Sequence, residues 1–103
     1  MHYVYTSVNF KEVSSISRQL RMKIKNDGYA TCYDFYIVTG QLNEEVYMNA
    51  NYKVRGWNTL LGFKIDKTSD GKWCLETPEV VEVIREINEY KKRRKNNENR
   101  NYE

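Results

Sequence analysis

Histidine is nearly absent from this sequence, which contains His2 and no other imidazole. A Ser-His-Asp or Cys-His catalytic set needs an imidazole beside its nucleophile, and one exposed-looking histidine offers no such set. The glycine-rich phosphate-binding loops and the HExxH zinc motif are missing as well. We therefore expect no catalytic residues, no cofactor and no enzymatic activity.

Cysteine is also scarce, since the chain has only Cys32 and Cys74, far apart and without CxxC spacing. Two thiols supply half of the four ligands that structural zinc normally takes. Four glutamates near the end of the chain are spaced three and four residues apart, which we interpret as a solvated helix face rather than a metal site. These residues are Glu79, Glu82, Glu86 and Glu89. We expect reduced thiols and no bound metal.

Long apolar runs are absent as well. No stretch approaches the roughly 20 apolar residues of a membrane span, and no charged start leads into an apolar signal region. Charged residues make up 30% of the chain, which is typical of soluble proteins. We expect no membrane partner and a cytoplasmic location.

Aromatic residues, by contrast, are plentiful, with nine Tyr, three Phe and two Trp among 103 residues. This length suits one domain with one core. Strand and helix patterns both occur, so we predict a small single-domain α+β fold. In it, a β-hairpin with an added N-terminal strand packs against two longer helices and one short helix. We place the domain at residues 1–95 and a frayed polar tail at residues 96–103.

The clearest local pattern is a β-hairpin. Residues 61–65 and 73–75 alternate apolar and polar side chains, with the period of two that marks half-buried strands. The loop at residues 69–71 favours a type I turn that closes on a left-handed glycine, and this places Ile65 opposite Leu75. Since two strands alone are not stable in water, the rest of the chain must cover their apolar face.

The first 28 residues predict a strand followed by a helix. Residues 2–6 form a β-prone run that would add a strand beside the hairpin. A helix should begin at Phe10 after an Asn9 cap and end near Gly28, which can adopt the left-handed conformation. Its apolar stripe comprises Phe10, Val13, Ile16, Leu20 and Ile24.

Two further helices are predicted from their terminal residues. Residues 31–39 are rich in β-branched and aromatic side chains, but Thr31 has the spacing of an N-cap and Gly40 can end a short helix. We predict a helix there. The last helix should begin at Pro78 after a Thr77 cap and lie on the hairpin face. The shared core would comprise Trp73, Phe63, Ile65, Leu20 and Ile84.

The middle of the chain, about residues 28–77, contains a pattern of structural glycines and aromatics. These residues are Gly28-Tyr29-Ala30-Thr31-Cys32-Tyr33-Asp34-Phe35-Tyr36, Gly40, Gly56-Trp57-Asn58 and Asp70-Gly71. The pattern resembles a small domain found in uncharacterised phage and mobile-element proteins. It implies a phage-like origin and no particular chemistry, so a host protein or nucleoprotein is the partner we expect, in the host cytoplasm.

Charge is segregated along the chain, with basic ends and an acidic middle. Residues 10–25 carry five cations and one carboxylate, while residues 91–103 carry six cations and two carboxylates. One hypothesis is a phosphate-binding surface without sequence preference, and the alternative is a solvated helix face. The candidate residues are Lys11, Arg18, Arg21, Lys25, Lys91, Lys92, Arg93, Arg94 and Lys95.

The long loop at residues 41–55 and the tryptophan after it supply the candidate protein-binding residues. They are Tyr47, Tyr52, Arg55 and Trp57. Exposed aromatics and arginine are enriched at protein interfaces, although the same residues could fold onto the core. We predict a non-enzymatic, anti-CRISPR-like accessory protein that occludes a host partner. The alternative is a nonspecific nucleic-acid-binding protein, and the acidic middle favours the first hypothesis. The sequence does not indicate an oligomeric state.

Overall fold

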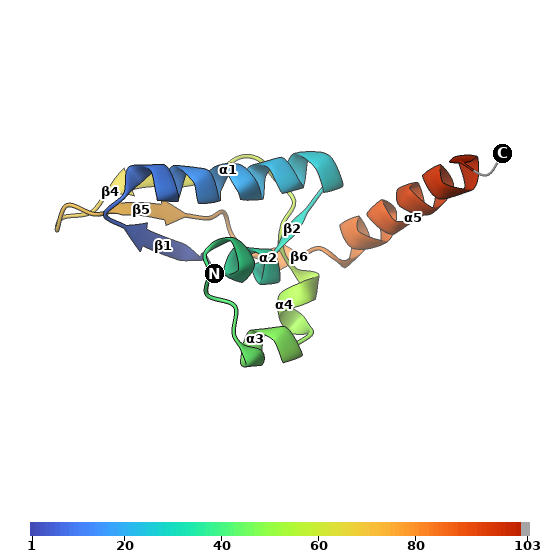
Figure 1. Cartoon of the computed structure of the whole chain (residues 1–103), viewed down its shortest axis with the longest axis horizontal. Coiled ribbons are helices and arrows are strands. Elements are labelled where there is room, and N and C mark those ends of the chain that lie inside the picture. Colours follow the sequence, from blue (N-terminus) through green and yellow to red (C-terminus); the bar gives the residue numbers. More distant parts are fainter. Residues whose placement is uncertain (102–103) are drawn as a thin grey trace.

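A three-stranded antiparallel sheet in the order β1-β5-β4 forms one layer of the molecule, and α1 lies along it (Figure 1). The computed structural model describes the backbone of residues 1–101 and the side chains of residues 1–95. The strands of this sheet are β1 (Val4–Ser7), β4 (Lys64–Lys67) and β5 (Trp73–Glu76). The predicted hairpin is confirmed, with Ile65 paired with Leu75, and β1 lies beside β5 as the predicted third strand.

The hairpin loop closes as its sequence predicts. The Thr68 N–H donates to the Lys72 carbonyl at 2.7 Å, and the Gly71 N–H donates to the Thr68 carbonyl at 3.1 Å. Gly71 has a φ of 87°, in the left-handed region that favours glycine. This geometry matches a three-residue loop that ends on a left-handed glycine, so the loop sequence fixes the register of both strands.

α1 (Phe10–Asp27) begins and ends where the sequence predicts. Asn9 Oδ1 accepts a hydrogen bond from the Lys11 N–H at 2.9 Å, and Gly28 takes the left-handed conformation with a φ of 90°. The predicted apolar stripe is buried except for Phe10, whose side chain is 47% exposed and lies against Trp73 with ring centroids 4.9 Å apart. The buried stripe packs on the sheet and supplies one side of the core.

A second small sheet, which was not predicted, joins segments that are far apart in the chain. It contains β2 (Ala30–Thr31), β3 (Arg55–Trp57) and β6 (Val81–Glu82) in the order β2-β3-β6. At Gly56 two backbones lie so close that a Cβ would come within 2.0 Å of the Ala30 carbonyl oxygen. Glycine is therefore required where β3 meets β2.

α2 (Cys32–Val38) confirms the helix predicted in the ambiguous segment. Thr31 Oγ1 accepts from the Asp34 N–H at 3.1 Å, and Asp34 Oδ2 accepts from the Thr31 N–H at 2.8 Å. This reciprocal capping box satisfies two N–H groups at the helix start. The terminal signals therefore outweigh the β-prone composition of the segment.

The chain next forms a lobe of two short helices, α3 (Glu44–Met48) and α4 (Asn51–Val54), which projects on the side of the molecule away from α1 (Figure 1). Asn43 starts α3 by accepting a hydrogen bond from the Val46 N–H at 2.9 Å. Val46 is buried and holds α3 against the rest of the protein. We refer to residues 41–54 as the α3–α4 lobe.

The predicted start of the last helix at Pro78 is wrong, because α5 (Ile84–Asn101) begins at Ile84. Long-range pairing keeps the preceding residues extended. Thr77 Oγ1 accepts from the Tyr3 N–H at 2.9 Å instead of capping a helix, and the Val80 N–H donates to the Met1 carbonyl at 2.8 Å. β6 then pairs with β3. These partners lie far away in the sequence, so the local Thr-Pro signal was misleading.

The predicted position of the last helix on the hairpin face is also wrong. α5 extends away from the sheet beyond the end of α1 (Figure 1), and Ile84 is 39% exposed instead of sharing the core. Tyr90 meets Tyr29 with ring centroids 6.1 Å apart, and Arg93 Nη2 donates to the Asp27 carbonyl at 3.2 Å. In the tail predicted at residues 96–103, the backbone is helical to Asn101, and residues 102–103 lie outside the described residues.

The core lies between α1, α2 and the two sheets. Trp57 and Leu20 are its largest fully buried side chains. Phe63, Ile65 and Trp73, which were predicted to be in the core, are half-buried and pack against its edge. The buried members are Val13, Ile16, Leu20, Ile24, Ala30, Cys32, Phe35, Trp57, Leu75 and Val80. The architecture is the small single-domain α+β fold predicted from the sequence.

Candidate functional site

Trp57 was predicted to be an exposed binding residue, and this prediction is wrong. Its side chain is 0% exposed, and its indole Nε1 donates to the Pro78 carbonyl at 2.8 Å. The indole ring also packs edge-on against Tyr3, with centroids 5.6 Å apart. Trp57 is therefore a core residue that links β3 to the segment before β6.

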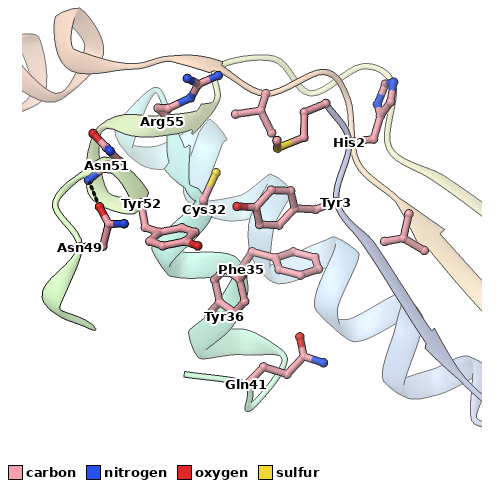
Figure 2. A pocket seen from close by; sticks show the side chains of 13 residues that line it. His2, Tyr3, Cys32, Phe35, Tyr36, Gln41, Asn49, Asn51, Tyr52 and Arg55 are labelled. Carbon is pink, nitrogen blue, oxygen red and sulfur yellow. Dashed lines mark hydrogen bonds between the residues drawn. The ribbon is translucent and has the colours of Figure 1, made fainter. Parts of the chain in front are cut away.

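Tyr52 and Arg55, two of the other predicted binding residues, line a surface pocket (Figure 2). The pocket has a volume of about 590 Å³ and lies between the start of β1, α2 and the α3–α4 lobe. This volume falls within the roughly 300–1,000 Å³ of typical ligand pockets. Tyr3, Cys32 and Tyr36 complete its inner wall. The structure thus assembles a site from three segments that the sequence patterns did not connect.

Aromatic rings pack edge-on along the inner wall of this pocket. Tyr3 lies 5.1 Å from Phe35 and 5.8 Å from Tyr36, measured between ring centroids. Tyr36 in turn lies 5.5 Å from Tyr52, with an interplanar angle of 84°. Edge-on aromatic pairs stabilise one another beyond their burial, so the wall is preorganised.

Three titratable side chains of the pocket have raised pKa values. Burial raises the pKa of the Tyr3 hydroxyl well above its ordinary value, and hydrogen bonding with Cys32 contributes to the shift. Burial likewise raises the pKa of the Cys32 thiol, although Arg55 acts in the opposite direction. The neighbouring Tyr36 raises the pKa of Tyr52. At neutral pH the wall therefore presents hydroxyls and a thiol instead of a reactive thiolate.

Tyr47 lies on the outer surface of the α3–α4 lobe, as a predicted binding residue should. It is 55% exposed, and its neighbour Met48 is 72% exposed. The Lys53 ammonium lies 5.0 Å from the centroid of the Tyr47 ring and 5.1 Å from that of Tyr33. This cation–π arrangement fixes the Tyr47 ring at the surface.

The structure places the end of the first basic segment beside the last one. Lys11, Arg18, Arg21 and Lys25 are all exposed on α1. The run Lys91, Lys92, Arg93, Arg94 and Lys95 is exposed on α5. Because Arg93 Nη2 bonds to the Asp27 carbonyl, the α5 run begins beside the last turn of α1. We refer to these nine residues as the α1–α5 basic surface.

The predicted row of glutamates is broken because the helix starts later than expected. Glu79 pairs with the Met1 amino group and with His2, Glu82 lies in β6, and Glu89 pairs with Arg85 on α5. Among the described residues, no group of three or more His, Cys, Asp or Glu side chains lies close enough to hold a metal ion. Cys32 and Cys74 are both free.

Among the described residues, none of the helices combines the length and apolar character needed to cross a membrane. Comparisons with protein-family models, curated proteins and solved structures gave no match. Over the described residues, the chain is a small α+β protein with an aromatic-lined surface pocket, an exposed α3–α4 lobe and the α1–α5 basic surface.

Sequence patterns missed the pocket residues Tyr3, Cys32 and Tyr36. Two signals pointed toward them, the aromatic Asp-Phe-Tyr helix and the Tyr residues of the first strand. These signals predict only a helix and a strand, because neither indicates which side chains from distant segments face one another.

Proposed function

We propose that this chain is a non-catalytic binding protein that docks on a partner protein through its α3–α4 lobe. The observation that supports this proposal is the exposure of Tyr47 and Met48 side by side on a projecting lobe. Tyrosine and methionine are enriched in protein interfaces, and a projecting lobe can reach a concave partner surface.

The expected partner is a host protein or nucleoprotein in the cytoplasm of the host cell. This part of the proposal rests on the resemblance of residues 28–77 to a domain of phage and mobile-element proteins. A small protein without a catalytic set would act there by occupying a surface that the partner needs, as an accessory or anti-defence protein.

Affinity capture from a host lysate with matched variants tests the lobe. The double variant Tyr47→Ala/Met48→Ala should bind the captured protein at least about 30-fold more weakly, since interface hot spots contribute about 2 kcal/mol or more. The control is Val8→Ala/Leu61→Ala, which removes exposed apolar side chains outside the lobe. Equal capture by the lobe variant and the control would refute docking through this lobe.

Nucleic-acid binding through the α1–α5 basic surface is a second candidate function. It is favoured by the contact between Arg93 and the end of α1, which places the α5 cations beside the last turn of that helix. The acidic Glu44 and Glu45 lie on the α3–α4 lobe, away from α1, so they do not interrupt it (Figure 1). Such a surface would bind phosphates without sequence preference.

A mobility shift with random single- and double-stranded oligonucleotides at about 150 mM salt tests the second candidate. If nucleic acid is the ligand, affinity should fall by about 0.9 logarithmic units per decade of salt for each neutralised duplex phosphate. The fourfold variant Lys11→Gln/Arg18→Gln/Arg21→Gln/Lys25→Gln should flatten this slope. The control carries four Gln substitutions at Lys64, Lys67, Lys72 and Arg85. Submicromolar binding that only the α1 variant abolishes would replace protein docking as the main function.

A further inference from the structure

The pocket beside α4 is lined by a cation and by no carboxylate. None of its lining residues is Asp or Glu, although Glu45 lies close enough to raise the pKa of Tyr52, and Arg55 lies at the pocket edge (Figure 2). Arg55 is exposed and makes no ion pair with any side chain among residues 1–95. A guanidinium without a carboxylate partner is suited to bind an anion, because its planar N–H groups match carboxylate and phosphate oxygens.

An amide side chain of the pocket also favours a ligand that accepts hydrogen bonds. Asn49 Oδ1 accepts from the Asn51 N–H at 3.0 Å. Because this amide oxygen is engaged, the NH₂ group of Asn49 remains as a donor. The Tyr52 hydroxyl lies beside that of Tyr36, which raises its pKa, so both rings face the pocket as neutral phenols.

The remaining surface of the pocket is aromatic and apolar. Phe35, Tyr36 and Tyr52 offer ring faces and edges, and Val80 closes the wall. Flat unsaturated rings pack well against such a surface. A volume of about 590 Å³ leaves room for a ring together with a charged substituent.

We infer that this pocket binds a small anion that carries a flat unsaturated ring, with Arg55 contacting the charge and Tyr36 and Tyr52 contacting the ring. Nucleotides and aromatic carboxylic acids share this chemistry. The site is separate from the exposed side chains of Tyr47 and Met48, so it does not depend on docking through the lobe. It gives the protein a small-molecule ligand in addition to any macromolecular partner.

Amide chemical-shift titrations of the full chain, with four probes, test this inference. Uridine 5′-monophosphate and indole-3-carboxylate each carry both a ring and a charge, whereas uridine lacks the charge and inorganic phosphate lacks the ring. At least one ring-bearing anion should shift amides in α2 and α4 and bind about tenfold or more tightly than uridine and phosphate. If only uridine 5′-monophosphate binds, the ligand class is the nucleotides, and if only indole-3-carboxylate binds, it is the aromatic carboxylic acids.

Substitutions of single pocket residues test which side chains contact the ligand. Arg55→Gln should weaken the binding of the ring-bearing anion by about tenfold or more, while Arg85→Gln, at an exposed site on α5, should not change it. Tyr52→Phe keeps the ring and removes the hydroxyl, so it should weaken binding less than Arg55→Gln does. The spectrum of each variant without ligand shows whether it folds.

Three results would overturn the inference. One is the absence of shifts in α2 and α4 with every probe at about 10 mM, since pocket ligands of this size typically bind far more tightly. Another is equal affinity for the charged and uncharged probes. The third is unchanged affinity in both folded pocket variants, Arg55→Gln and Tyr52→Phe.

Discussion

Gly56 shows how a single residue decides whether two strands can pair. A Cβ at this position would lie 2.0 Å from the Ala30 carbonyl oxygen and 2.6 Å from the Thr31 Cα. Both are backbone atoms of β2, so neither can turn aside as a flexible side chain does. Gly56→Ala should therefore destabilise the protein by about 3 kcal/mol or more, as overpacking of a rigid site does. Chemical denaturation measures this change.

The control for Gly56→Ala is Gly71→Ala. Gly71 has a left-handed φ of 87°, but a Cβ there meets nothing within 4 Å. Gly71→Ala should cost only the roughly 1–2 kcal/mol of the left-handed conformation. If the two substitutions have equal effects, the close approach of β2 and β3 is not what requires glycine at position 56.

Glu12 provides a second test at the scale of single residues, and this test depends on pH. The Tyr5 hydroxyl and then the Ser7 hydroxyl donate to its carboxylate, and they hold the pKa of Glu12 below its ordinary value. Because the pKa of Glu12 is lower in the folded protein than in the unfolded chain, its ionised carboxylate stabilises the folded protein at pH values above the unfolded-state pKa. This stabilisation is lost as the pH falls through the folded-state pKa. Tyr5→Phe should raise the Glu12 pKa, measured from carboxyl carbon shifts. An unchanged pKa would contradict the Tyr5 contact.

At the scale of helices and strands, the sequence predicts the elements whose signals are local. The hairpin loop, α1 and α2 all carry their own turn or capping residues, and each lies where it was predicted. The start of α5 and the second sheet depend on pairing between distant segments, so local signals could not place them. For the same reason the pocket and the burial of Trp57 were not predicted, and local signals left open whether Tyr47 is exposed or folds onto the core.

The corrected position of α5 predicts a contrast between two apolar substitutions. Leu20 is fully buried on α1, so Leu20→Ala should cost about 2–5 kcal/mol. Ile84 is 39% exposed at the start of α5, so Ile84→Ala should cost less than about 1 kcal/mol. Denaturation of both variants under the same conditions checks this order. If Ile84→Ala lowers the free energy of unfolding as much as Leu20→Ala does, the result would contradict the exposed position of Ile84. It would support packing of the last helix on the hairpin face.

At the scale of the whole molecule, the exposed surfaces lie on different sides of one core. α1 and the α3–α4 lobe occupy opposite sides in Figure 1, with the sheets and α2 between them. Side chains that share no partner and lie more than about 7–10 Å apart contribute independently to stability. The α1 part of the basic surface and the tip of the lobe meet this condition, so their substitutions can be combined.

The last prediction uses this separation. The Tyr47→Ala/Met48→Ala variant, the fourfold α1 variant and their combination should have changes in unfolding free energy that add within about 0.5 kcal/mol. In binding assays, the lobe variant should lose the protein partner but keep any mobility shift, and the α1 variant should do the reverse. Chemical denaturation, affinity capture and mobility shift on the same three proteins check this. If either variant weakens both binding activities by similar factors, the two surfaces form parts of one interface, as expected if the partner is a nucleoprotein that contacts both sides of the molecule.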